Sequence, residues 1–246
     1  MAAVQIIILL LLAWAALIVL ARAVEHSPRD GGDWTLAWLV VCIYTRLIHR
    51  VRFEGLEHIP RWKRGDPAPG PLVVVSNHTA GVDPLLIHAA CPFDIRWIMM
   101  REMMLTPFAR FWAWLEIIPV DQNGRDSTSI RTAIRHLQSG AAIGIFAEGG
   151  IERPREHINP YLPGIGLLVL KSKARVLPVV IRGTPRVDSA YHSLLRPSRS
   201  IVKFMPVRTF TKDSTPAEIA HALEAQAAAA LGWARCAKDL SHPAKK

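Results

Sequence analysis

The chain has 246 residues, 50% of them hydrophobic, which is enough for one sizeable core with apolar surface left for a bilayer. Thirty Lys and Arg against twenty Asp and Glu give a formal net charge of +10, which favours anionic partners such as phospholipid headgroups. Cys42, Cys91 and Cys236 are widely spaced and form no CxxC pair, which argues against a disulfide framework or a cysteine zinc site and for a reducing, cytoplasmic-side domain.

The chain begins with an apolar segment long enough to cross a membrane. Residues 2–21 carry no charge and only one strongly polar side chain, Gln5. About 20 such residues span a hydrocarbon core of roughly 30 Å as a helix. A cleaved signal peptide is the alternative, but no basic residues precede the apolar run, and the run is long for such a peptide. We therefore expect a retained transmembrane anchor.

A second apolar segment, residues 34–44, is too short to cross a membrane alone. It can be an interfacial helix, the second leg of a membrane hairpin, or a buried helix of the soluble domain. The basic cluster RLIHRVR at residues 46–52 indicates that the domain after it lies on the cytoplasmic face. We assign residues 1–50 to the membrane anchor.

Apolar, β-branched runs recur along the rest of the chain, as expected for buried strands. The sequence predicts strands at residues 71–76, 95–100, 141–147, 175–182 and 201–205. Helical patterns lie between them, at residues 127–140 and 164–173. The alternation predicts an α/β domain over residues 51–211, with a central, largely parallel sheet and flanking helices.

Two further segments carry weaker signals. Residues 96–116 contain four Met and five aromatic residues among three Arg, and we expect part of this stretch to face lipid and the rest to be core. Residues 212–246 are predicted to form a C-terminal helix and a basic tail. Thr215 stands at the N-cap of that helix, Pro216 at its first position, and Glu218 completes a capping box.

The segment SNHTAGVDP, residues 76–84, contains a candidate catalytic pair. It comes directly after a predicted strand, and Asp83 and Pro84 are suited to begin a helix, with Asp83 capping the free amides. If the loop folds Asp83 onto His78, the carboxylate accepts the Nδ1 proton and leaves Nε2 free to deprotonate a hydroxyl. The HxxxxD spacing alone arises easily by chance, so a simple helix cap beside a polar loop histidine stays open as the alternative.

Three more stretches come after this pair along the chain: IIPVDQNGRD (117–126), FAEGGIERP (146–154) and VLPVVIRG (176–183). Together with NHTAGVDP (77–84), they resemble in order the four motif blocks of the glycerolipid acyltransferase family, whose archetype is lysophosphatidic acid acyltransferase. The similarity covers about residues 50–210. Four ordered blocks arise by accident far less often than one, so the catalytic interpretation is favoured.

The resemblance implies roles for individual residues. His78 would be the general base and Asp83 its orienting partner, while Glu148 and Gly149 would help to bind the glycerol phosphate of the acceptor. Gly150 and Ile151 stand where the family has Thr and Arg, and Gln122 replaces the Arg of the second block. Arg125 and Arg153 are therefore candidates for the missing positive charge, with a solvated surface role as the alternative. The substrate-binding candidates are Asn77, Glu148, Gly149, Gly150, Arg125, Arg153 and Pro178.

The function implied by the resemblance is a membrane-bound O-acyltransferase of phospholipid biosynthesis. It would transfer a fatty acyl group from acyl-CoA or acyl carrier protein to lysophosphatidic acid, giving phosphatidic acid. Glycerol 3-phosphate, another lysophospholipid or a lyso-aminolipid as acceptor, and a catalytically silent lipid-binding relative, stay open. The donor is a co-substrate, and we expect no cofactor and no metal, because the candidate ligands lack a close motif such as HExxH. Scattered Lys and Arg without a zinc-finger or RNP-like pattern argue against nucleic-acid binding.

Overall fold

A seven-stranded sheet lies at the centre of the computed structural model, which describes residues 32–62, 70–121 and 127–236 together with Gln5. Its strands stand in the order β1 (Arg52–Glu54), β8 (Ile201–Phe204), β7 (Arg175–Arg182), β2 (Leu72–Ser76), β5 (Ala142–Phe146), β3 (Ile95–Met100) and β4 (Ile118–Val120). Every neighbouring pair is parallel except β7 and β8. The prediction of a central, largely parallel sheet is confirmed.

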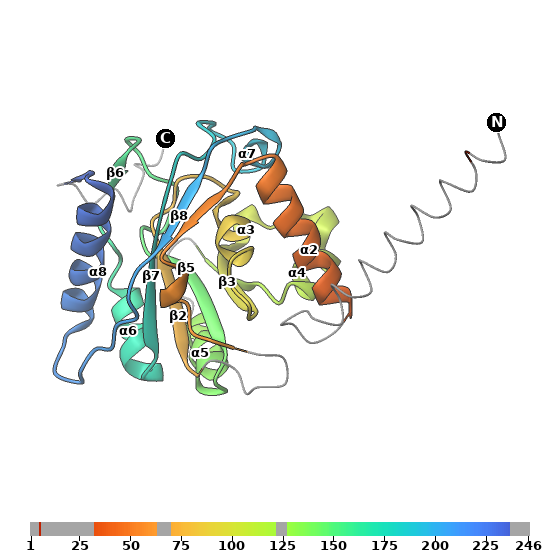
Figure 1. Cartoon of the computed structure of the whole chain (residues 1–246). Coiled ribbons are helices and arrows are strands. Elements are labelled where there is room, and N and C mark those ends of the chain that lie inside the picture. Colours follow the sequence, from red (N-terminus) through yellow and green to blue (C-terminus); the bar gives the residue numbers. More distant parts are fainter. Residues whose placement is uncertain (1–4, 6–31, 63–69, 122–126, 237–246) are drawn as a thin grey trace.

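Helices cover both faces of the sheet (Figure 1). On one side lie α5 (Ser127–Gln138), α6 (Gly164–Ser172) and α8 (Pro216–Leu231); on the other lie α2 (Gly32–Leu47), α3 (Asp83–His88) and α4 (Ala109–Trp114). Shorter elements complete the described part: α7 (His192–Leu195), the 3₁₀ turns η1 (Leu56–His58), η2 (Arg101–Met103) and η3 (Thr106–Phe108), and a two-stranded sheet of β6 (His157–Ile158) and β9 (Ala234–Arg235).

Strand β2 shows why the predicted strands read as unbroken apolar runs. Val73 and Val75 pack into one core cluster with residues of α5, α6 and α8. Leu72 and Val74 point the other way and join a second cluster with residues of α3. Because side chains alternate along a strand and both faces are covered, every position of β2 is buried. The carboxyl end of this central strand is followed by the loop of residues 77–82, which leads to α3.

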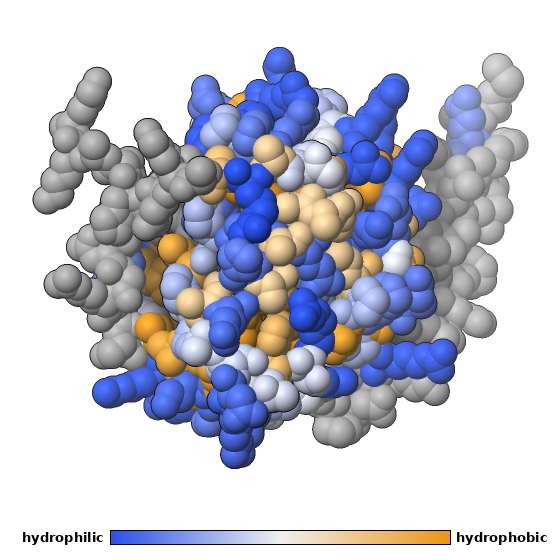
Figure 2. Space-filling view, turned by 90° about the vertical axis from the view of Figure 1, so that its left-hand side faces the viewer, coloured by the Kyte–Doolittle hydropathy of each residue, from blue (hydrophilic) through white to orange (hydrophobic). Residues whose placement is uncertain are grey.

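The C-terminal helix belongs to the same core as the sheet. Thr215 accepts a hydrogen bond from the backbone N–H of Glu218, and the Glu218 carboxylate accepts one from the backbone N–H of Thr215, so the capping box is present. Ile219 and Leu223 of α8 are almost fully buried and pack in the cluster that includes Val73. Figure 2 shows the outer face on the α8 side, where moderately hydrophobic residues run between hydrophilic ones.

Helix α2 packs on one side only. Thr35 and Thr45 are buried, and α2 contacts α3. The other side exposes four apolar residues, which we call the α2 stripe: Leu36 (43% exposed), Val40 (64%), Ile43 (59%) and Leu47 (70%). Spacings of three and four residues place them on one helix face. The interpretation of this segment as a buried core helix is therefore wrong for this face.

The predicted transmembrane segment, residues 2–21, lies outside the described residues except for Gln5. Within the described ranges, no helix combines the length and apolar character that crossing a membrane requires.

Candidate active site

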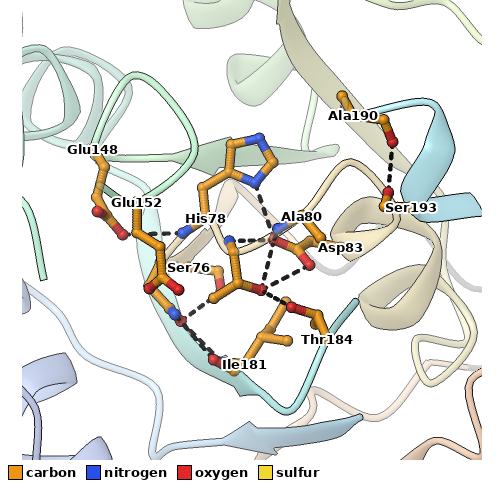
Figure 3. A network of polar contacts seen from close by, with 12 residues as sticks. Ser76, His78, Ala80, Asp83, Glu148, Glu152, Ile181, Thr184, Ala190 and Ser193 are labelled. Carbon is orange, nitrogen blue, oxygen red and sulfur yellow. Dashed lines mark hydrogen bonds and ion pairs between the residues drawn. The ribbon is translucent and has the colours of Figure 1, made fainter. Parts of the chain in front are cut away.

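The turn between β2 and α3 brings His78 and Asp83 together (Figure 3). His78 Nδ1 lies 3.0 Å from Asp83 Oδ2. The Asp83 side chain is fully buried, whereas 18% of the His78 side chain is exposed. The other ring nitrogen, Nε2, points away from Asp83 (Figure 3). The buried Asp83 carboxylate thus contacts one nitrogen of a partly exposed imidazole and leaves the other nitrogen free of this contact.

Asp83 also organises the turn that carries the histidine. Its Oδ2 accepts hydrogen bonds from the backbone N–H groups of Thr79 (2.6 Å) and Ala80 (2.9 Å), and Thr79 Oγ1 donates to Oδ1 at 3.0 Å. The expectation that Asp83 caps the free amides of α3 is wrong. Helix α3 begins at Asp83 itself. The N–H groups that donate to its carboxylate belong to Thr79 and Ala80 of the turn, because these residues fold back over the Asp83 side chain.

An aromatic stack fixes the plane of the imidazole. The rings of His78 and Phe146 are stacked, with centroids 4.1 Å apart and planes 14° apart. Phe146 stacks in turn on Trp97, with centroids 5.1 Å apart. Gly144 makes room for this arrangement, because a Cβ there would lie 2.4 Å from the indole ring of Trp97. Phe146 stands in the third motif block, but its contact with His78 was not predicted.

Two of the substrate-binding candidates, Asn77 and Pro178, lie just after β2 and within β7. Asn77 is fully buried; its Nδ2 donates to the backbone oxygen of Ile181 (3.0 Å), and its Oδ1 accepts from the backbone N–H of Ile181 (2.8 Å). The side-chain amide thus continues the pairing of β2 with β7 beyond the last backbone pair. Pro178 is buried within β7, opposite Val75. These contacts position the strand end that precedes His78, and a contact with substrate stays a prediction.

Glu148 connects the catalytic turn to a neighbouring loop. Glu148 is 5% exposed; its Oε1 accepts from the backbone N–H of His78 and its Oε2 from the backbone N–H of Asn159, both at 3.0 Å. Burial raises the pKa of Glu148 to about 8, although these two backbone donors act in the opposite direction. The predicted contact of Glu148 with the acceptor stays a prediction, since both oxygens are occupied by the protein backbone here.

The remaining candidates lie further along the same loop. Gly149 has a φ of +74°, and a Cβ there would lie 2.7 Å from Leu162 Cδ1, so this position favours glycine. Gly150 faces open space. Arg153 Nη2 lies 3.2 Å from Asp188 Oδ1, and 45% of the Arg153 side chain is exposed. Arg125 lies outside the described residues.

Three residues that were not among the candidates also contact the catalytic turn. Arg155 donates to the backbone oxygen of Thr79, and the backbone N–H of Glu152 donates to the backbone oxygen of His78. Thr184, just after β7, donates to Thr79 through its hydroxyl. Glu152 and Arg155 stand in and beside the third block, which is the only signal that the sequence offered.

The pair of His78 and Asp83 is suited to general base catalysis. An imidazole whose Nδ1 proton is held by a carboxylate presents an unprotonated Nε2 that can remove a proton from a hydroxyl group. In the described ranges, no group of three or more His, Cys, Asp and Glu side chains is arranged to hold a metal ion. The prediction of a reaction without metal stays a prediction.

Residues 50–182, more than half of the chain, match the family model described as Acyltransferase. The chain belongs to the acyltransferase family, and the resemblance to glycerolipid acyltransferases is confirmed at that level.

Individual relatives agree with this assignment. A 1-acyl-sn-glycerol-3-phosphate acyltransferase of Bacillus subtilis (strain 168) is 26% identical over 123 residues. That match spans 49% of this chain and 60% of the relative, which is less than two thirds of its length. The crystal structure of the 1-acyl-sn-glycerophosphate (LPA) acyltransferase PlsC from Thermotoga maritima is similar with a TM-score of 0.64 at 20% identity, covering 95% of this chain and 91% of that chain. The two proteins share the fold.

Proposed function

We propose that this chain transfers a fatty acyl group from a thioester donor, acyl-CoA or acyl carrier protein, to the hydroxyl of lysophosphatidic acid, giving phosphatidic acid. The observation that carries the proposal is the 3.0 Å contact between the Asp83 carboxylate and Nδ1 of a partly exposed His78. The family match and the activity named for the Bacillus subtilis relative support the substrate class.

The reaction proceeds by direct attack of the acceptor on the donor. His78 Nε2 removes the proton of the acceptor hydroxyl as its oxygen attacks the thioester carbonyl carbon. The tetrahedral intermediate then expels the thiolate, which takes up the proton from the imidazolium. An ester bond forms and a thioester bond breaks, so no acyl-enzyme is needed. Asp83 holds the imidazole in the required tautomer and stabilises its charged form.

The test is acyl transfer by the purified wild type and by His78→Ala, with radiolabelled acyl-CoA. We expect His78→Ala to lower kcat by about 10²- to 10⁴-fold, the usual contribution of a general base. His88→Ala is the matched control, since His88 lies on the adjacent helix α3 and is similarly exposed, at 16%. Transfer by His78→Ala at the wild-type rate would contradict the mechanism.

The acceptor is tested with a panel, because the third block departs from the family at Gly150 and Ile151. Lysophosphatidic acid, glycerol 3-phosphate, other lysophospholipids and a lyso-aminolipid are offered with each donor. Product formed only with lysophosphatidic acid would support the proposed acceptor. A folded wild type that is inactive with every acceptor and with both donors would favour a catalytically silent lipid-binding protein.

Arg153 is the described candidate for the phosphate of the acceptor. It is half exposed, and its partner Asp188 is fully exposed, so this ion pair is weak and can be exchanged for a phosphate. We expect Arg153→Ala to raise the KM for lysophosphatidic acid about tenfold while kcat changes little, as for the loss of one charged contact. An unchanged KM would assign Arg153 to the solvated surface.

We further propose that the protein works at the cytoplasmic face of a membrane, with the α2 stripe in contact with lipid. The stripe exposes four apolar residues on one helix face, and Arg46, Arg50 and Arg52 are exposed at and beyond its carboxyl end. Apolar residues beside a basic cluster suit an interface with anionic headgroups. The apolar segment at residues 2–21, which the sequence predicts to be an anchor, precedes this helix.

A further inference from the structure

The backbone of the catalytic turn is held on one side by the loop of residues 148–156. His78 N–H donates to Glu148 Oε1 at 3.0 Å, and the His78 carbonyl oxygen accepts from the Glu152 N–H at 2.7 Å. The next carbonyl oxygen, that of Thr79, accepts from Arg155 Nη1 at 2.6 Å. One loop thus binds three backbone groups of the turn: the N–H and the carbonyl oxygen of His78, and the carbonyl oxygen of Thr79.

A second segment, residues 184–190, holds the turn from another side. Thr184 Oγ1 donates to Thr79 Oγ1 at 2.8 Å. A Cβ at Gly81 would lie 2.3 Å from the backbone oxygen of Ala190, so this segment lies directly against the turn. Arg155 Nη2 donates to the backbone oxygen of Val187 at 2.7 Å, which links this segment to the loop and to the turn.

We propose that Arg155 is a positioning residue for the reaction, whose guanidinium group fixes the His78 turn by bridging the carbonyl oxygens of Thr79 and Val187. This inference rests on the proposed function. Thr79 is the residue directly after His78, and it also donates to Asp83 through its backbone N–H and its hydroxyl. A shift of Thr79 therefore changes the direction of the imidazole and the place of its carboxylate partner together.

The chemistry of the side chain suits this role. A guanidinium group offers several N–H donors in a rigid plane, so two of its nitrogens can serve two carbonyl groups at fixed separation, whereas the ammonium group of lysine acts as a point charge. Hydrogen bonds from a charged donor are stronger than neutral ones, and both contacts here are short. One N–H of Nη1 and one of Nη2 each donate to a backbone oxygen, so the guanidinium lies between the turn and the segment of residues 184–190.

The kinetic test compares wild type, Arg155→Ala, Arg155→Lys and Arg186→Ala as full chains. Arg186 is the matched control, since it is an exposed arginine of the same region whose partner is Glu156. Misplacement of a catalytic group by about 1 Å can cost up to about 10²-fold in rate, so we expect Arg155→Ala to lower kcat about 10- to 100-fold with little change in acceptor KM. Arg155→Lys should be intermediate, and millimolar guanidinium chloride, but not potassium chloride, should restore part of the loss in Arg155→Ala.

A second readout does not depend on turnover. Spectra of ¹⁵N-histidine-labelled protein report the tautomer of each imidazole, and His78→Gln identifies the His78 signals. We expect the Nδ1-protonated tautomer in the wild type and in Arg186→Ala, and a mixed or exchange-broadened signal in Arg155→Ala. If the wild type transfers no acyl group to any acceptor, the proposed function fails, and these spectra still decide the role of Arg155.

Two outcomes would overturn the inference. One is an Arg155→Ala protein with wild-type kcat and unchanged His78 signals. The other is a raised acceptor KM with unchanged His78 signals, which would make Arg155 a ligand of the acceptor. If Arg155→Ala fails to fold, Arg155→Lys decides: a protein with wild-type melting temperature, wild-type kcat and wild-type His78 signals would also overturn it.

Discussion

Glu152 is a buried carboxyl group directly beside the catalytic turn. Glu152 is 2% exposed, and one of its carboxyl oxygens, Oε2, has no hydrogen-bond partner within the described part of the chain. The other, Oε1, accepts from the backbone N–H of Glu156 at 3.2 Å. Burial raises the pKa of Glu152 from its ordinary value of 4.5 to about 7. The folded protein therefore keeps this group protonated at pH values where the unfolded chain releases the proton.

This difference predicts a pH dependence of stability. Between about pH 4.5 and pH 7 the folded state binds more protons at Glu152 than the unfolded state, so the free energy of unfolding falls as the pH rises through this window. Glu152→Gln removes the effect, and we expect the variant to gain about 1–3 kcal/mol relative to the wild type between pH 5 and pH 8.5. Urea unfolding of both proteins across this range measures it. A constant difference between the two proteins at all pH values would contradict the prediction.

At the scale of secondary-structure elements, the close contact of α6 with the start of α8 depends on one glycine. A Cβ at Gly166 would lie 2.2 Å from the backbone oxygen of Pro216 and 2.5 Å from its Cα. Gly166 is buried in α6, and the two helices pack together in the cluster that covers one face of the sheet. Backbone atoms cannot rotate away as a side chain can, so an added methyl group has to move a helix.

We expect Gly166→Ala to lower the free energy of unfolding by about 1–3 kcal/mol, the usual cost of overpacking a core. In a chain of this size, each kcal/mol lowers the melting temperature by about 2–4 °C, so we expect a fall of a few degrees. Gly164→Ala is the matched control, because it lies in the same helix and faces open space. Thermal melts of the three proteins provide the measurement. A melt of Gly166→Ala at or above that of Gly164→Ala would show that α8 accommodates the methyl group without cost.

At the scale of the whole molecule, exposed apolar residues gather around α2 and α4. Trp34 at the start of α2 stacks on Trp114 of α4, with ring centroids 4.4 Å apart, and the two helices lie side by side (Figure 1). Phe108 and Phe111, at the start of α4, are 52% and 47% exposed. This agrees with the expectation that part of residues 96–116 faces lipid, which stays a prediction. Together with the α2 stripe, these side chains form an apolar surface of the kind that marks interaction sites.

Contact of this surface with a bilayer is measurable by spin labelling. Cysteine is placed at Val40 in the α2 stripe or, as the control, at Leu56 in η1, which is exposed to 48%. Cys42 and Cys236 are replaced by serine. In vesicles containing anionic lipid, we expect a label at position 40 to collide more often with oxygen than with a water-soluble nickel reagent, and a label at position 56 to show the reverse, since oxygen is enriched in hydrocarbon. Equal accessibility of the two labels to the nickel reagent would exclude lipid contact for the stripe.

The sequence by itself determined the fold class. Buried strands such as β2 are almost entirely apolar because both of their faces are covered. Helix limits such as Thr215 and Gly140 depend on the residue type at one position, an N-cap hydroxyl or a glycine with positive φ, and can be read from the sequence. The pairing of His78 with Asp83 could also be predicted from the sequence, since the two residues are five positions apart in one turn and the ordered motif blocks supported their roles.

Only the tertiary structure decided how the other site residues are used. Glu148, Phe146 and Arg155 reach the catalytic turn from about 70 residues away in the sequence, and no local pattern encodes which group of the turn each one contacts. The same reason explains why the predicted cap at Asp83 was wrong. The preference of Asp for helix starts concerns the free N–H groups of the first helical turn, whereas in the fold the N–H groups of residues 79 and 80 lie against the carboxylate. Helices and turns arise from interactions within a few residues, but a site arises from the packing of distant segments around a sheet end.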